Sequence, residues 1–333
     1  MRALYAFFAV ILLVSIPFIG VQYFHLQYTF GVLIPYVAFF TFILGFIFKI
    51  LYWAKSPVPF NITTTAGQQK SLSWIKSDRF ENPSSTFGVI GRMALEILVF
   101  RSLFRNSKAG LSENFKPGYA SEKTLWLAGL VFHWSFFLVV VRHLRFFISP
   151  IPDALLTIET VDTLFQIGLP VLYLTDVLLV VSVSFLFIRR VIIPHVKYIS
   201  LAADYFPLYI ILLIAVTGML MRYYARVDVM EVKNLTMGLV SFSALSRPVL
   251  PAQSTILYVH LFLVSTLLVY FPFSKLMHMG GIFFSPTRNM TGDARKTHHV
   301  NPWNYPVKVH TYQEYEEENK EAMKGAGLPV ERE

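Results

Sequence analysis

Four histidines lie within apolar stretches of the chain, where ionisable side chains are rare. His133 and His143 share one stretch, ten residues apart, and His260 and His278 share another, eighteen residues apart. An imidazole at membrane depth is costly, so each is a candidate for metal ligation or proton relay. One such histidine would often just bond a neighbouring helix, but two pairs on two segments favour a shared function.

The rest of the composition excludes several kinds of metal site. The chain has no cysteine, which excludes thiolate-held iron–sulfur clusters and thioether-linked haem. Zinc needs four close ligands, whereas each expected site offers two. Two neutral imidazoles from facing helices suit six-coordinate haem b. We therefore expect two haems b, with a haem-free proton relay as the alternative.

The chain has the composition of an integral membrane protein. It is 55% hydrophobic and 15% charged, with a mean hydropathy of +0.53. Six runs are long enough to cross about 30 Å of hydrocarbon: 3–21, 30–54, 124–148, 166–193, 205–226 and 253–277. We expect an all-α, six-span helical bundle with two haems b between the third and sixth spans. The net charge of +9 is attributed to membrane topology rather than to nucleic-acid binding.

Charges in the loops predict the orientation. Lys and Arg are frequent in residues 55–123 and recur at Arg189 and Arg190, whereas residues 149–165 carry Asp153, Glu159 and Asp162 and no basic residue. Basic loops stay on the cytoplasmic side, so both termini are expected there, in a multi-pass protein of the cytoplasmic membrane.

The span order predicts how the histidines pair. The third and sixth spans run antiparallel, so His133 should face His278 near the inner side and His143 should face His260 near the outer side. In a continuous helix, eighteen residues complete five turns, so His260 and His278 should lie on the same face. Because the two spacings differ, the members of each pair should be offset by about 6 Å along the membrane normal. Pro272 is expected to kink the sixth span and relieve part of this stagger.

Four arginines near the span ends are candidates for binding haem propionates through charge-assisted hydrogen bonds. Snorkelling to lipid headgroups is the alternative for each of them. They are Arg142, Arg145, Arg222 and Arg226.

Four regions are expected along the chain: two N-terminal spans (1–54), a cytoplasmic loop (55–123), the four-helix di-haem domain (124–278) and a cytoplasmic tail (279–333). The loop should hold a helix over 87–105. An interfacial position for it is opposed by Arg92/Glu96 and Arg101/Arg105, which would fall on opposite sides of one helix, so packing on a partner fits as well. The acidic tail is expected to lie along another subunit.

Two histidine motifs, FHW…RH and YVHLF…FSKLMH, resemble the di-haem gamma subunit of respiratory nitrate reductase over about 90–280. The first span and the tail HHVNPWNYPVKVHTYQEYEEENKEAMKGAGLPVERE resemble more closely the cytochrome b of the membrane complex linked to dissimilatory sulfite reductase, over nearly the whole chain. This resemblance implies a menaquinol site beside the outer haem and a cytoplasmic iron–sulfur partner, related to heterodisulfide reductase, beside the inner one. It also implies that the chain assembles with the other subunits of that complex.

The chain departs from the gamma subunit in the loop after its two-histidine helix. The gamma subunit has a basic residue there, near its quinol pocket, whereas SPIPDALLTIETVD carries Glu159 and Asp162. These two acids are candidate acceptors for the quinol protons, with exposed loop acids or helix caps as the alternative.

The expected function is electron transfer between menaquinol and an iron–sulfur subunit docked on residues 55–123 and the tail, in dissimilatory sulfur metabolism, with the direction of flow left open. The alternatives are a di-haem anchor for a hydrogenase or formate dehydrogenase, or a haem-free proton-relaying subunit.

Overall fold

The structure is a computed structural model of the 333-residue chain. It describes residues 2–56, 58, 61–62, 67–111, 117–165, 171–247, 250, 254–294, 296, 306 and 309–331, with the backbone alone for 107–111, 117–121 and 164–165.

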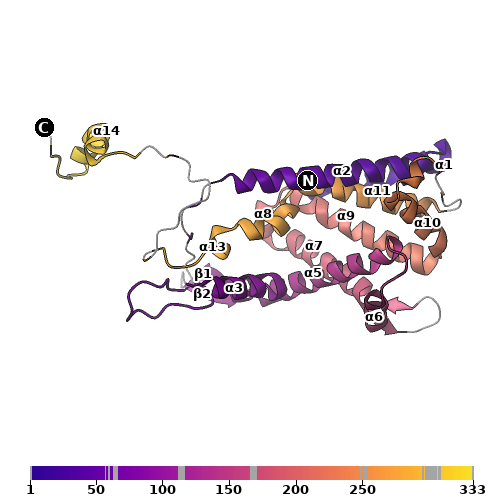
Figure 1. The fold of residues 1–333 in the computed structure, drawn as a ribbon, viewed down its shortest axis with the longest axis horizontal. Helices are drawn as coiled ribbons and strands as arrows, with labels where there is room; N and C mark the ends of the chain where they lie inside the picture. The colour runs from indigo at the N-terminus through magenta and orange to yellow at the C-terminus, as the bar shows by residue number, and fades with distance from the viewer. Residues whose placement is uncertain are drawn as a thin grey trace.

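Long helices run side by side along the molecule (Figure 1). The α-helices are α1 (Arg2–Phe24), α2 (Ile34–Ala54), α5 (Lys123–His143), α7 (Leu174–Ile192), α9 (Ala202–Met219) and α11 (Thr255–Tyr270). Short turns extend three of them: η1 (Thr29–Leu33) before α2, η2 (Leu144–Phe146) after α5 and η3 (Leu220–Tyr224) after α9.

Five of the predicted spans are matched by helices long and apolar enough to cross a membrane: 2–24, 29–54, 123–146, 202–224 and 255–273. The fourth predicted span differs. Its helix α7 begins at Leu174, and residues 166–170 lie outside the described part. Charges near the two ends of α7, at Asp176, Arg189 and Arg190, lower its apolar character.

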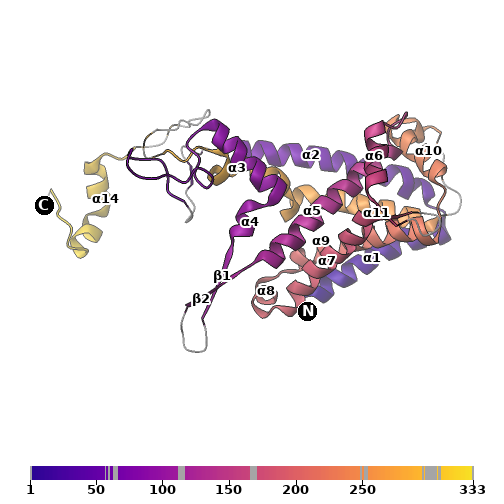
Figure 2. The same ribbon diagram turned by 90° about the horizontal axis from the view of Figure 1, so that it is seen from below.

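Short elements gather at the two ends of the bundle (Figure 2). One end, called the α6 end, holds α6 (Asp153–Val161), α10 (Val229–Val240) and η4 (Ser243–Leu245). The other, the α3 end, holds α3 (Thr86–Val99), α4 (Arg101–Arg105), α8 (Pro194–Ile199) and α13 (Pro286–Asn289). Helix α14 (Tyr312–Gly325) stands apart from the bundle beyond the α3 end in Figure 1.

The prediction of an all-α protein is confirmed, and two pairs of short antiparallel strands occur outside the long helices. Strands β1 (Ser107–Leu111) and β2 (Pro117–Ser121) pair after α4, and β3 (Thr163–Phe165) pairs with β4 (Leu172–Tyr173) before α7.

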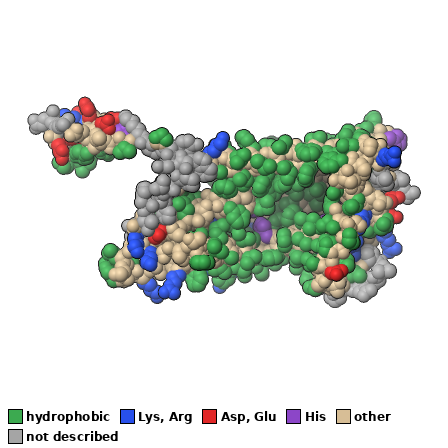
Figure 3. All heavy atoms as spheres, viewed as in Figure 1, with side chains coloured by type: hydrophobic (Ala, Val, Ile, Leu, Met, Phe, Trp, Pro, Cys, Tyr) green, Lys and Arg blue, Asp and Glu red, His purple; other side chains and the backbone are tan. Residues whose placement is uncertain are grey.

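The helices pack as an open arc. Helix α7 packs between α5 and α9, α9 packs on α11, α11 packs on α2, and α1 lies against α9 and α11. The core between α7, α9 and α11 contains Val183, Ile210 and Leu263. Within the described residues, α5 does not pack closely on α11. Figure 3 shows a hollow on this apolar side of the molecule, with a histidine side chain visible in it.

The sixth predicted span is broken rather than kinked. Helix α11 ends at Tyr270, Pro272 lies in the turn η5 (Phe271–Phe273), and Ser274 is extended, its side chain accepting a hydrogen bond from the Leu276 N–H. The turn η6 (Lys275–Met277) then leads into α12 (His278–Gly281), η7 (Ile282–Phe284) and α13. The prediction that His260 and His278 share one continuous helical stripe is therefore wrong, because the proline and the extended residue interrupt the helical rise.

The predicted helix over 87–105 is also interrupted. Phe100 adopts the left-handed conformation, with φ 51° and ψ 49°, and divides the segment into α3 and α4. The charged residues of the two halves therefore no longer follow a single helical wheel.

Candidate functional site

All four membrane histidines have Nδ1 within hydrogen-bond distance of an oxygen. The partners are the carbonyls of Gly129 for His133 (2.7 Å), Val139 for His143 (2.7 Å) and Lys275 for His278 (2.9 Å), and the hydroxyl of Thr217 for His260 (2.9 Å). A carbonyl only accepts, so Nδ1 must carry the proton and Nε2 keeps its lone pair. This is the tautomer that a metal-ligating histidine needs.

The ring of His260 is the most buried of the four. It is 9% exposed, and the Thr217 hydroxyl donates to the Leu213 carbonyl at 2.7 Å, so that its oxygen accepts from the Nδ1–H. Gly218 lies beside the ring, and a Cβ at that position would stand 3.4 Å from the Cε1 of His260. Helix α9 thus fixes the orientation of a ligand candidate on α11.

His133 and His278 come together across the gap between α5 and the broken sixth span. Their ring centroids are 5.9 Å apart, with the ring planes at 84°. An iron held by two Nε2 atoms, with metal–imidazole bonds of about 2 Å, would place the ring centres about 6 Å apart. The rings of Phe100 and Phe132 stand edge-on to His133, at 4.9 and 5.0 Å between centroids.

His143 and His260 lie nearer the α6 end than the first pair. His143 is the last residue of α5, and His260 lies in the first half of α11. The contact between His133 and His278 agrees with antiparallel spans, and the pairing of His143 with His260 stays a prediction. In the described part of the chain no three acidic or histidine side chains converge on one point, so the candidate ligands come in twos.

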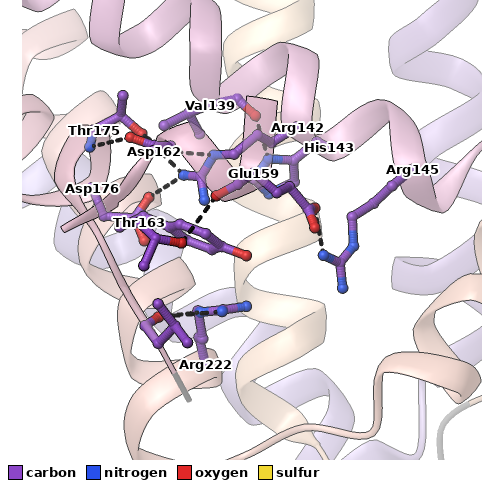
Figure 4. A network of polar contacts seen from close by, with 12 residues as sticks. Val139, Arg142, His143, Arg145, Glu159, Asp162, Thr163, Thr175, Asp176 and Arg222 are labelled. Atoms are coloured by element: carbon purple, nitrogen blue, oxygen red, sulfur yellow. Dashed lines mark hydrogen bonds and ion pairs between the residues drawn. The ribbon is translucent and has the colours of Figure 1, made fainter. Parts of the chain in front are cut away.

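A buried ionic network surrounds Arg142, next to His143 (Figure 4). The Arg142 side chain bonds Asp176 and lies with its Nε 3.0 Å from Asp162 Oδ2. Asp162 in turn accepts from the N–H of Thr175 at 2.9 Å and from its hydroxyl at 2.6 Å. Arg142, 6% exposed, thus joins the end of α5 to the start of α7.

The other three candidate arginines have different surroundings. Arg145 pairs with Glu159 of α6. Arg222 donates to the Val171 carbonyl at 3.3 Å and lies 4.3 Å from the centre of the Tyr173 ring, on which Arg142 also stacks at 3.8 Å. Arg226 is exposed, with φ 49°.

The propionate-binding role of the four arginines stays a prediction, as does proton acceptance by Glu159 and Asp162. The structure adds groups that sequence reasoning missed. Asp176 could have been noticed as an acid inside a predicted span. Thr217 had no comparable signal, because a hydroxyl in a helix commonly bonds its own backbone.

An apolar groove of about 490 Å³ lies between α5, α6 and α7. Its walls include Trp134, Leu138 and Ile158, and its polar side groups are Ser135, Thr157, Thr175 and Asp162. The groove is large enough for a small aromatic ligand.

Residues 84–292 match the nitrate reductase gamma subunit family. The chain belongs to this family. The match contains all four membrane histidines, together with the helices from α3 to α13. The predicted resemblance to the gamma subunit is thereby confirmed, and the N-terminal helices α1 and α2 lie outside this match.

Two curated relatives extend the similarity over most of the chain. The "Hdr-like menaquinol oxidoreductase cytochrome b-like subunit" of Archaeoglobus fulgidus is 42% identical over 279 residues, covering 82% of this gamma-family chain and 83% of the relative. The protein of the same name from Archaeoglobus profundus is 37% identical over 274 residues, covering 81% of each chain.

Proposed function

We propose that this chain is a membrane cytochrome b that binds two haems b and carries electrons between menaquinol near the outer face and a cytoplasmic iron–sulfur subunit related to heterodisulfide reductase, in dissimilatory sulfur metabolism. The observation that carries the proposal is the set of four Nδ1-anchored imidazoles on α5 and the broken sixth span, of which His133 and His278 meet across the gap. The names of the two relatives support the quinol substrate and the kind of partner.

The residues fit this cofactor. His133 and His278 would hold the inner haem, and His143 and His260 the outer one, each through Nε2. Haem supplies one-electron chemistry when bound. The protein's part is to hold the imidazoles at a fixed spacing, to protonate Nδ1, and to exclude water with apolar side chains such as Phe100 and Phe132.

The α3 end is proposed to be cytoplasmic. Arg189 and Arg190 lie there at the end of α7, whereas the acidic Asp153 and Glu159 lie at the α6 end. We further propose that α7 is the fourth of six spans, because each of its charges has a partner. Arg189 lies 3.3 Å from Glu122, Arg190 lies 4.0 Å from Asp204, and Asp176 bonds Arg142.

The quinol is proposed to react toward the α6 end, with its ring in or beside the groove between α5, α6 and α7. Of the two candidate acids, Glu159 is the better proton acceptor. Asp162 is already occupied by Arg142 and by both donors of Thr175, whereas Glu159 has Arg145 as its side-chain partner and is 18% exposed. Asp162 then acts through Arg142, by holding the end of α5 beside His143.

The partner subunit is proposed to dock at the α3 end and on α14. This helix has a capping box at Thr311 and Glu314, so its fold is locally defined, and Tyr312 and Tyr315 are half-exposed on it. An amphipathic helix with an acidic side suits a groove with a basic rim on another protein.

The test is a haem assay on single His→Ala variants of the intact complex. His133→Ala and His278→Ala should remove the same haem, and His143→Ala and His260→Ala the other, as seen in reduced-minus-oxidised spectra. His195→Ala, on exposed α8, is the matched control and should keep both haems. Fewer than two haems in the unmodified protein, or loss paired in any other way, would contradict the proposal.

A further inference from the structure

Helix α3 has its polar side turned inward and its apolar side turned outward. Arg92 and Glu96 are 2% and 5% exposed, whereas Phe87 and Ile90 are 88% and 60% exposed. Along the same face the exposed fraction is 50% for Leu98. This pattern is the reverse of a helix that faces water.

The arginines of α3 and α4 are gathered around Glu81. Arg92 donates to the backbone carbonyl of Glu81, while Arg101 and Arg105 both bond the side chain of Glu81. The left-handed Phe100 makes this possible, because it ends α3 and redirects the two following arginines toward Glu81. A single helix over 87–105 would have placed these charges on two opposite sides. The break at Phe100 keeps all of them away from the outward face of α3.

The outward face of α3 continues the lipid-facing surface of a spanning helix. Two indoles of α5 cap the last carbonyls of α3: Trp126 Nε1 donates to Val99 at 2.7 Å, and Trp134 Nε1 donates to Leu98 at 3.0 Å. Trp134 is 41% exposed, and Phe137, one turn further along α5, is 55% exposed.

We propose that α3 lies against the bilayer, with its outward face in contact with the acyl chains of the leaflet at the α3 end. The face carries no charge, it adjoins the exposed apolar surface of α5, and Arg101 and Arg105 are turned toward Glu81 rather than toward this face. An apolar patch of this kind is stable against lipid and unfavourable in water. The partner here is a lipid surface, and the proposal does not depend on haem binding.

The contact would act on the inner histidine pair. Phe100 at the end of α3 has its ring against His133, and the two tryptophan bonds hold this junction on α5. A bilayer-anchored α3 therefore holds the ring that covers one side of the His133 imidazole.

The test places the photo-reactive amino acid p-benzoylphenylalanine at Ile90 or Ile97, one variant at a time, in the full complex in its native membrane. The same replacement at Phe137 is the lipid-facing reference, and at Trp74, 79% exposed outside the spans, the reference for water. Irradiation should give lipid adducts at both α3 sites, with a yield within about twofold of that at Phe137. Adducts to another protein, or no lipid adducts where Phe137 gives them, would overturn the proposal.

A second measurement avoids the bulky side chain. The chain has no cysteine, so Ile90→Cys and Phe137→Cys each give one site for a nitroxide in the full chain in lipid nanodiscs. Collisions with oxygen should exceed those with a water-soluble nickel complex at both positions. The reverse order at Ile90 would mean that α3 faces water and would refute the membrane contact.

Discussion

Replacing Thr217 by valine should weaken the proposed outer haem site without disturbing the fold. Valine keeps the shape of threonine but removes the oxygen that accepts the Nδ1–H of His260 at 2.9 Å. His260 is buried, so the imidazole N–H would have no water to replace the lost acceptor.

The size of the effect of Thr217→Val follows from the burial of the His260 ring. An unsatisfied buried donor costs about 1–3 kcal/mol, and loss of such an outer partner typically lowers metal affinity about 10- to 100-fold. The lost bond also makes the imidazole less basic, which disfavours oxidised iron. A difference of about 1 kcal/mol between the two oxidation states raises a one-electron potential by about 40 mV.

The assay is a redox titration of both haems together with their content per polypeptide. Thr266→Val is the matched control, because the Thr266 hydroxyl donates to the Phe262 carbonyl at 2.8 Å and holds no histidine. Thr217→Ser should restore the original potential. If Thr217→Val behaves like Thr266→Val in both haem content and potential, then anchoring at Nδ1 does not hold the ligands and the reasoning for all four histidines fails.

Further predictions concern the surroundings of the outer pair. Arg142→Met leaves buried Asp162 and partly buried Asp176 without their cation. It should lower the free energy of unfolding by about 3–5 kcal/mol, measured by thermal or denaturant unfolding, while exposed Arg226→Met should change it little. Leu138→Trp fills part of the groove between α5, α6 and α7 and should raise the KM for a menaquinol analogue. Phe137→Trp, on the exposed side of α5, should leave this KM unchanged. Equal KM values for the two variants would place the quinol elsewhere. Glu159→Gln should reduce quinol oxidation about 100-fold with unchanged haem spectra, if this carboxylate takes the proton, and an unchanged rate would remove it from that role.

Much of the architecture was accessible from local properties of the chain. Hydropathy alone located five helices of spanning length, because the free energy of placing a side chain in hydrocarbon depends mainly on that side chain. Counting six spans makes the third and the sixth antiparallel, which is why His133 could be assigned to His278 before any contact was known.

The details of the site could not be obtained in this way. Thr217 meets His260 from 43 residues away, and Arg142 meets Asp176 from 34 residues away, through helix faces that come together only in the packed bundle. Pro272 predicted a kink in the last span, but the position of the break also depends on Ser274, which is extended and caps the next turn.

The sequence by itself determined which residues prefer hydrocarbon and which pairs of histidines can meet, since both follow from composition and order. Only the tertiary structure decided which nitrogen of each imidazole is free and where the charges of residues 92–105 point. The reason is that a hydrogen bond or an ion pair is satisfied by whichever group packing brings within about 3 Å, and the left-handed turn at Phe100 redirects two arginines to a carboxylate that no helical period would have assigned to them.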